Sequence, residues 1–165
     1  MGFTIIEVVL VLAIAGLIMM VVFITVPSVQ RGQRDATRKE DISTLLAAVK
    51  KYQTNNRGAL PESTGSFTYR AADANNKTTW GGFYYYYLGD KFVDPNGTAY
   101  TLRVENCSGN LGVTCKEKST GAMDYTMYIE IGASCDGPKA IRTENPRKIA
   151  VVYKLEGGEA YCGNS

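Results

Sequence analysis

Hydrophobic and polar positions divide the chain into one long apolar run and a longer region of mixed pattern. No residue from Val8 to Val26 carries a charge, and one acidic residue, Glu7, stands at the start of the run. A helix needs roughly 20 apolar residues to cross a bilayer, so the run predicts a helix long enough to span a membrane. An ionisable group in hydrocarbon costs about 2.5–3.5 kcal/mol on insertion scales, and less near a helix end. We therefore expect Glu7 to have a partner.

Two simpler interpretations of the apolar run explain less. A cleaved secretory signal has an apolar core of roughly 7–15 residues followed by an A-x-A-like site, whereas Ala13-Ile-Ala15 lies inside the run. A permanent membrane anchor is compatible with the run. An anchor does not by itself explain Glu7. In that interpretation the Glu7 side chain only extends from the apolar helix to the polar surface of the membrane.

The pattern after the run predicts that the helix continues. Apolar residues recur at the period of an amphipathic helix: Ile42, Leu45, Leu46, Val49 and Tyr52. The segment Asn55–Gly58, followed by Pro61, is a helix stop signal. We therefore expect one helix over residues 3–57.

This helix has two parts and two weak points. Residues 3–26 form the membrane-spanning part, and residues from about 33 to 56 form the amphipathic part. Gly16 and Pro27 weaken it, because glycine lowers helix propensity and proline removes a backbone hydrogen bond.

Beyond residue 61 the pattern is typical of β-strands in a globular region over residues 58–165. Alternation such as that in Tyr125–Ile131 indicates a sheet with one buried face. The expected strands are Phe83–Leu88, Tyr100–Glu105, Tyr125–Gly132 and Ile149–Leu155. Short turns favour an antiparallel meander packed on the amphipathic helix, and the polar segment Ser63–Thr79 is expected to be a loop. The fold class is α+β, with a long N-terminal helix on a small antiparallel sheet.

Composition excludes several function classes. The 165 residues carry a net charge of +2 and include no histidine. Histidine is the commonest general base and metal ligand, so Ser-His and Cys-His catalysis are excluded. No P-loop, dinucleotide fingerprint or internal repeat is present. We expect a protein that is not an enzyme, with no catalytic residue and no cofactor.

The four cysteines lie in the C-terminal half, at Cys107, Cys115, Cys135 and Cys162. An even count in a small exported domain indicates two disulfides, for which three pairings are possible. Spacing favours Cys107–Cys115, closing a short loop, and Cys135–Cys162, tying the chain end to a strand. A zinc site would need all four thiolates at irregular spacing, so we expect no metal.

An aromatic run and an acidic turn could each be interpreted as a binding site, but a structural role explains both. Trp80 and the aromatic run Phe83–Tyr87 resemble a stacking surface for sugars or single-stranded DNA. A strand would place about half of these side chains in the core, so packing is favoured. Asp94–Gly97 is typical of a β-turn, and Asp90 and Asp94 supply too few ligands for calcium.

At Gly2-Phe3-Thr4-Ile5-Ile6-Glu7 the chain resembles the type IV pilin family, which includes pseudopilins and competence pilins. The resemblance covers about the first thirty residues. It implies that a prepilin peptidase cuts between Gly2 and Phe3, leaving residues 1–2 as a leader remnant, and that Phe3 is N-methylated. It also implies that Glu7 faces the N-terminal amine of a neighbouring subunit. In pilin filaments the stretch between such helix-weakening residues is often unwound, so the resemblance implies unwinding between Gly16 and Pro27, to an extent that it does not define.

The function that the resemblance implies is that of a type IVa-like major pilin, a homopolymer used for twitching motility, adhesion or DNA uptake. Its expected partners are the prepilin peptidase, the membrane before assembly, and an inner-membrane platform with cytoplasmic motor ATPases. A host or surface ligand is possible, and nucleic acid is unproven. The alternatives are a minor pilin, a type II secretion pseudopilin, or a membrane-anchored extracellular binding domain that does not polymerise.

The expected location is the bacterial cytoplasmic membrane for the precursor and an extracellular filament after assembly. The basic residues Arg31, Arg34, Arg38 and Lys39 follow the apolar run. By the positive-inside rule alone, they would keep the C-terminal part in the cytoplasm. A short or truncated leader and the paired cysteines favour export instead.

Overall fold

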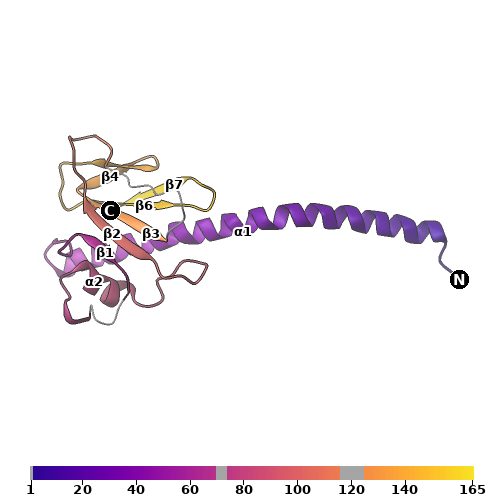
Figure 1. Ribbon diagram of the computed structural model, residues 1–165, viewed down its shortest axis with the longest axis horizontal. Helices are drawn as coiled ribbons and strands as arrows, with labels where there is room; N and C mark the ends of the chain where they lie inside the picture. The colour runs from indigo at the N-terminus through magenta and orange to yellow at the C-terminus, as the bar shows by residue number, and fades with distance from the viewer. Residues whose placement is uncertain (1, 70–73, 116–124) are drawn as a thin grey trace.

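The computed structural model describes residues 2–69, 74–115 and 125–165. Its longest element is α1, Ile5–Asn55, a single helix of 51 residues that continues through Pro27. The first half projects from the rest of the molecule, and the second half lies against the globular head (Figure 1). The long helix expected from the sequence is therefore present.

The far end of α1 is closed by backbone hydrogen bonds. Asn56 donates its N–H to the carbonyl of Tyr52 at 3.0 Å, and Gly58 donates to that of Gln53 at 2.7 Å. Gly58 has a φ of 81°, a left-handed conformation that glycine adopts without a steric penalty. This is the usual way in which a glycine ends a helix, and it agrees with the stop signal in the sequence.

The head is built on a five-stranded sheet in the order β1-β2-β3-β6-β7. Its strands are β1 (Gly65–Phe67), β2 (Thr101–Asn106), β3 (Thr126–Ile131), β6 (Ile149–Lys154) and β7 (Ala160–Asn164). Every neighbouring pair is antiparallel except β2 and β3, which are parallel. The protein is therefore an α+β structure with a mostly antiparallel sheet, as expected.

The main core lies between this sheet and α1. The helix contributes Ile42, Leu45 and Val49, each completely buried. The alternate residues of the central strands face them: Leu102, Val104, Met127, Ile129, Ile149, Val151 and Tyr153. Since successive side chains of a strand point to opposite faces, this register leaves the intervening residues to the other side of the sheet.

A second layer covers part of that other side. It is the hairpin of β4 (Ala133–Asp136) and β5 (Lys139–Arg142), whose strands pair antiparallel. Ala133 and Ala140 of the hairpin pack with Ala150 and Val152 of β6 in a small cluster. Strand β6 is therefore buried on both faces, which explains its nearly continuous apolar sequence.

The aromatic segment Phe83–Leu88 is helical, so the prediction of a strand there was wrong. It forms α2 (Trp80–Phe83) and continues as a π-helix, η2 (Tyr84–Leu88). The Thr79 side chain caps α2 by accepting the N–H of Gly82 at 3.2 Å. The aromatic rings then pack at helical spacing: Phe83 lies edge-on to Trp80 and stacks on Tyr87. Tertiary packing and the cap outweigh the β-propensity of the aromatic residues.

The prediction of a simple antiparallel meander was also wrong. Strand β3 pairs with β2 in parallel, which requires a long crossover rather than a hairpin turn. The chain between Asn106 and Thr126 supplies that length. In addition, the expected loop Ser63–Thr79 contains edge strand β1, which pairs with β2.

Candidate functional site

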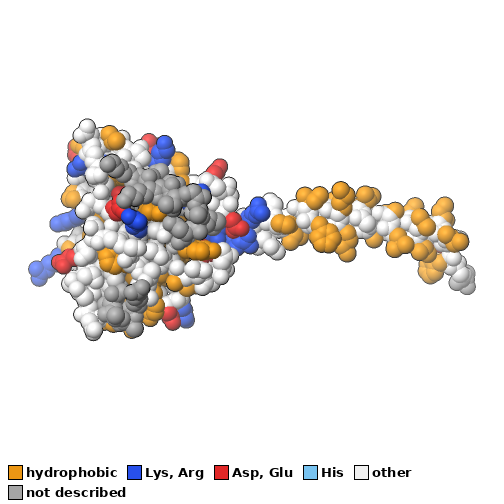
Figure 2. All heavy atoms as spheres, viewed as in Figure 1, with side chains coloured by type: hydrophobic (Ala, Val, Ile, Leu, Met, Phe, Trp, Pro, Cys, Tyr) orange, Lys and Arg blue, Asp and Glu red, His pale blue; other side chains and the backbone are white. Residues whose placement is uncertain are grey.

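The first half of α1 exposes an apolar surface that the head does not cover. Large apolar side chains from Phe3 to Val29 are exposed, with Phe3 at 87% and Phe23 at 76%. Figure 2 shows clusters of apolar side chains along this projecting rod, beside the mixed surface of the head. Within the described residues, α1 is the one helix long and apolar enough to cross a membrane. An apolar surface of this extent requires lipid or protein around it.

Glu7 lies on the first turn of this rod. Its Oε2 atom accepts hydrogen bonds from the Thr4 N–H at 3.4 Å and from the Thr4 hydroxyl at 3.2 Å. These contacts cap the positive end of the helix dipole with a negative charge. Both contacts use Oε2, so Oε1 can accept a bond from a cation outside the chain. Gly2 and Phe3 precede the helix, next to this carboxylate in the chain.

Gly16 and Pro27 lie inside α1 without interrupting it. The helix is continuous on both sides of each residue, and a side chain added at Gly16 would meet open space. The helix is therefore intact in the single chain. Unwinding between Gly16 and Pro27 in an assembled filament stays a prediction.

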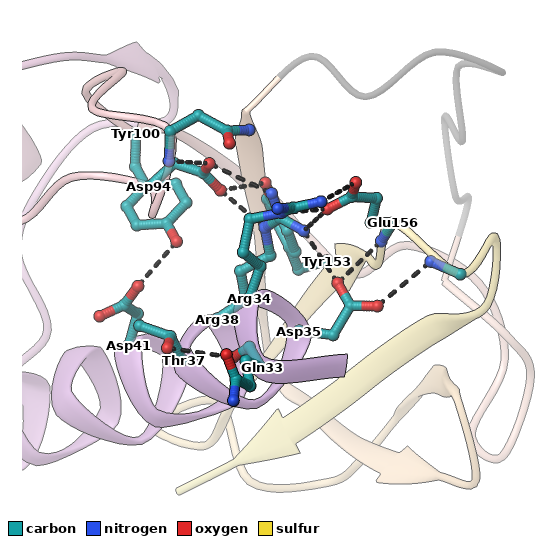
Figure 3. Close-up of polar contacts among 12 residues, drawn as sticks. Gln33, Arg34, Asp35, Thr37, Arg38, Asp41, Asp94, Tyr100, Tyr153 and Glu156 are labelled. Atoms are coloured by element: carbon teal, nitrogen blue, oxygen red, sulfur yellow. Dashed lines mark hydrogen bonds and ion pairs between the residues drawn. The ribbon is translucent and has the colours of Figure 1, made fainter. Parts of the chain in front are cut away.

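Where α1 enters the head, a buried ion pair joins the two parts of the molecule (Figure 3). Arg38 donates from Nε to Asp94 Oδ2 at 2.7 Å and from Nη2 to Asp94 Oδ1 at 3.2 Å. Both side chains are fully buried. Asp94 also accepts a bond from the Tyr153 hydroxyl at 3.3 Å. A planar guanidinium that meets a carboxylate at two points fixes the orientation of both groups.

A second, more exposed layer of charges surrounds this pair. Arg34 binds Glu156 through two contacts, of 2.6 and 2.8 Å, and Arg38 reaches the same carboxylate at 3.2 Å. The hydrogen bond from Arg34 is the main reason why the pKa of Glu156 is lowered to about 2. The turn after β6 is thereby held against α1.

Asp35 fixes the same turn through its backbone. Its carboxylate accepts the N–H groups of Glu156 at 2.9 Å and Gly157 at 3.1 Å. Burial by itself would raise the pKa of Asp35, but these bonds and Arg38 bring it below its usual value. On the opposite side, Asp41 accepts the Tyr100 hydroxyl at 2.7 Å, and burial raises the pKa of Asp41.

Sequence reasoning missed this junction, although a signal for it was present. Arg38 lies four residues before Ile42, on the same helical face as Leu45 and Val49. A charged residue at a core position of an amphipathic helix requires a buried partner. Asp94 was assigned only to a β-turn. That turn is present, with Gly97 donating to the Asp94 carbonyl at 2.7 Å.

The geometry also bears on metal binding. The Asp94 carboxylate is occupied by Arg38, so it does not point into an open calcium loop. Across the residues that the structure describes, one group of potential ligands lies close together, namely Cys107, Cys115 and Glu130. Its two sulfur atoms form a disulfide and offer no thiolates, so this group lacks the donors of a zinc site.

The cysteines pair as Cys107–Cys115 and Cys135–Cys162, the two pairs that the spacing favoured. The first closes the segment that follows β2, and the second joins β4 to β7. Both lie in the small cluster on the outer side of the sheet. The Cys135–Cys162 disulfide therefore fastens the β4–β5 hairpin to edge strand β7 of the sheet.

No protein-family model matches the chain, and neither a curated protein nor a solved structure similar to it was found. The shape that the residues build is a long, apolar N-terminal helix packed through its second half on a disulfide-bonded, mostly antiparallel sheet. This shape is consistent with a pilin. The apolar half of α1 is compatible with insertion of a precursor into a membrane.

Proposed function

We propose that the protein is the structural subunit of a type IV pilus, a major pilin that polymerises through the first half of α1. The observation that carries this proposal is the exposed apolar rod from Phe3 to Val29 with a single acidic residue, Glu7, on its first turn. In the membrane, lipid covers the rod. In a filament, the rods of neighbouring subunits cover one another, so the apolar surface avoids water in both states.

The role of Glu7 in this proposal is to set the axial position of one helix against the next. Apolar helices slide past one another at little cost, whereas a charge pair fixes one register. The partner is the N-terminal ammonium of Phe3 in a neighbouring copy, created by cleavage after Gly2. Opposite unit charges about 4 Å apart attract by about 4 kcal/mol at an effective dielectric constant near 20. Desolvation offsets much of this attraction, so its main effect is on specificity.

The remaining parts fit the same function. The head is attached to the amphipathic half of α1 by the core and by the Arg38–Asp94 pair, so a pull on the head is transmitted to the rod. The prepilin peptidase, the membrane platform and the motor ATPases belong to the proposal as partners. The filament would serve twitching, adhesion or DNA uptake outside the cell.

The deciding experiment expresses the full chain in cells with an intact pilus system and images sheared surface fibres. We expect thin fibres whose main protein begins with N-methylated phenylalanine. The Glu7→Ala variant should be exported and cleaved yet form no fibres, whereas Glu7→Asp should retain some assembly. Normal fibre yield from Glu7→Ala would refute the role of the carboxylate. A chain that stays in the membrane as a monomer would support a membrane-anchored binding domain instead.

A further inference from the structure

A pocket at the end of the head far from the apolar rod gathers positive charge. It has a volume of about 430 Å³ and lies between α1 and the turn that precedes β6. Lys50, Arg147 and Lys148 line it, together with the polar residues Gln53, Asn145 and Asn164 and the apolar residues Leu46 and Ala47 of α1. No acidic side chain is part of this lining. Ser165 also lines the pocket, and a terminal carboxylate there would offset at most one of the three positive charges.

Hydrogen bonds between side chains and the backbone hold the pocket in shape and leave its three cationic groups unused. Gln53 donates from Nε2 to the Arg147 carbonyl at 2.9 Å. The Arg147 N–H donates to Asn145 Oδ1 at 2.9 Å, which fixes the turn. Among the described residues, no ion pair joins Lys50, Arg147 or Lys148 to an acidic group. These three cations are exposed and available to a partner.

The opposite end of the head carries an exposed acidic residue, Glu159. It lies in the turn between β6 and β7, which is closed by a bond from the Leu155 N–H to the Glu159 carbonyl at 2.8 Å. Its neighbour Glu156 is bound by Arg34, whereas Glu159 forms no ion pair within the part of the chain that the structure describes. Glu159 is therefore the free carboxylate of this turn.

The pairing of β6 with β7 places the pocket and this turn at opposite ends. Ala150 pairs with Asn164 beside the pocket, and Lys154 pairs with Ala160 beside the turn. The turn points toward the rod side of the head (Figure 1). The part of α1 from Arg34, which binds this turn, to Gln53, which contacts the pocket, is about 28 Å long at 1.5 Å per residue.

We propose that the pocket of one copy receives the Glu159 carboxylate of a second copy, so that heads stack end to end along the filament. This inference rests on the proposed function. A contact between two different surfaces of the same chain propagates as an open array, which is what a filament requires. Ammonium, guanidinium and amide donors match a carboxylate in charge and in hydrogen bonding. Two pockets facing each other would repel, so the alternative symmetric contact is disfavoured.

Charge reversal in the full-length protein tests this contact. Lys148→Glu and Glu159→Lys should each lower the ratio of filament to membrane-bound subunit by about fivefold, since the exposed pair is replaced by a repulsive one. The double variant should restore the ratio, because it exchanges the two charges. Lys139→Glu and Asp136→Lys, the same changes on the exposed β4–β5 hairpin, should leave the ratio unchanged. Equal amounts of subunit in the membrane establish that each variant is folded and exported.

Zero-length carbodiimide crosslinking of wild-type filaments gives an independent readout. Mass spectrometry of filaments made from a mixture of isotopically light and heavy subunits should find Glu159 joined to Lys50 or Lys148 of another copy. Filaments in which these lysines are joined to a different acidic residue would overturn the assignment. So would single variants with normal yield, or a double variant that fails to recover. If wild-type filaments form but the crosslinks or the charge-reversal results differ from those expected, only the contact between Glu159 and the pocket is refuted. If the wild-type protein forms no filaments at all, the proposed function is refuted as well.

Discussion

Arg38 of α1 and Asp94 of the turn before β2 form a fully buried, two-point ion pair, with N–O distances of 2.7 and 3.2 Å. Apolar contacts between α1 and the sheet are non-directional. A buried charge, in contrast, has to meet its partner away from water, which adds a specific constraint on the axial position of α1. The pair therefore sets the position at which the rod leaves the head, and so the geometry that each subunit presents to its neighbours.

Removing one member of this pair should be costly. Arg38→Met leaves the Asp94 carboxylate buried without its cation, and we expect a loss of about 3–5 kcal/mol in the free energy of unfolding. Urea unfolding of the full chain in detergent measures this, with fluorescence of the single tryptophan, the buried Trp80, as the signal. Arg31→Met is the control, because Arg31 is exposed and lies before the head.

The double variant Arg38→Met/Asp94→Leu should recover part of that loss. Replacement of both charges by apolar groups removes the unpaired buried carboxylate, although Tyr153 then loses the carboxylate that accepts its hydroxyl. A single variant as stable as the Arg31→Met control would show that the pair does not stabilise the junction.

The free energy of unfolding should fall in acid, and Glu156, which joins the turn after β6 to α1, should account for part of this loss. Its pKa is lowered from the ordinary value of 4.5 to about 2, chiefly by the hydrogen bond from Arg34. A carboxyl group whose pKa is lower in the folded protein than in the unfolded chain stabilises the folded state. This contribution is complete at pH values above the pKa of the group in the unfolded chain. It is lost as the pH falls through the pKa of the group in the folded protein. The expected window is therefore from about pH 5 down to about pH 2.

Glu156→Gln isolates this contribution. The difference in unfolding free energy between wild type and variant should be largest near neutral pH and should shrink toward pH 2. Asp41 has a raised pKa because of its burial and acts in the opposite direction, but both proteins contain it, so its effect cancels in the difference. A difference that stays constant from neutral pH to acid would contradict the role assigned to the carboxylate.

The sequence predicted the architecture where one pattern extended over many residues. The apolar run and the spacing of Ile42, Leu45 and Val49 predicted α1 and its buried face, because a helix of this length repeats its signal many times. Strands β2, β3 and β6 followed from alternation and β-branched residues. The disulfides followed from cysteine spacing, since only three pairings were possible.

The errors arose where local preference and tertiary context disagree. Phe83–Leu88 has the composition of a strand, yet the Thr79 cap and the packing of Phe83 on Tyr52 and Trp80 make it helical. Short strands such as β4, β5 and β7 have too few residues to show a period. The parallel pairing of β2 with β3 depends on contacts between distant segments, which no local pattern encodes. The partner of Arg38 was missed for the same reason, because Asp94 is distant in sequence.

The two disulfides should differ in what their removal costs. Cys135 and Cys162 are separated by 27 residues, and Cys107 and Cys115 by 8. In the chain-entropy account, a longer closed loop restricts the unfolded chain more. Replacing Cys135 and Cys162 by serine should therefore cost about 1 kcal/mol more than replacing Cys107 and Cys115. Urea unfolding of the two double-serine variants, each against the oxidised wild type, gives the comparison. A larger cost for Cys107 and Cys115 would show that the short loop closed by their disulfide stabilises the β4–β5 hairpin in the folded protein, in addition to its effect on the unfolded chain.

Gly82 should not tolerate a side chain, although its backbone conformation is ordinary. A Cβ atom at this position would lie 1.8 Å from the carbonyl oxygen of Asn76, which is backbone and cannot rotate away. Gly82→Ala should therefore force α2 away from the preceding loop, at a cost of about 3 kcal/mol or more in unfolding free energy. Gly32→Ala is the matched control, since Gly32 lies in α1 with open space around it. That change should be neutral or stabilise the helix by up to about 1 kcal/mol.

Because Trp80 and Phe83 lie on the same short helix as Gly82, the Gly82→Ala variant should also show a shift in tryptophan emission before global unfolding. If Gly82→Ala matched Gly32→Ala in stability, the close approach of α2 to Asn76 would not exist in solution.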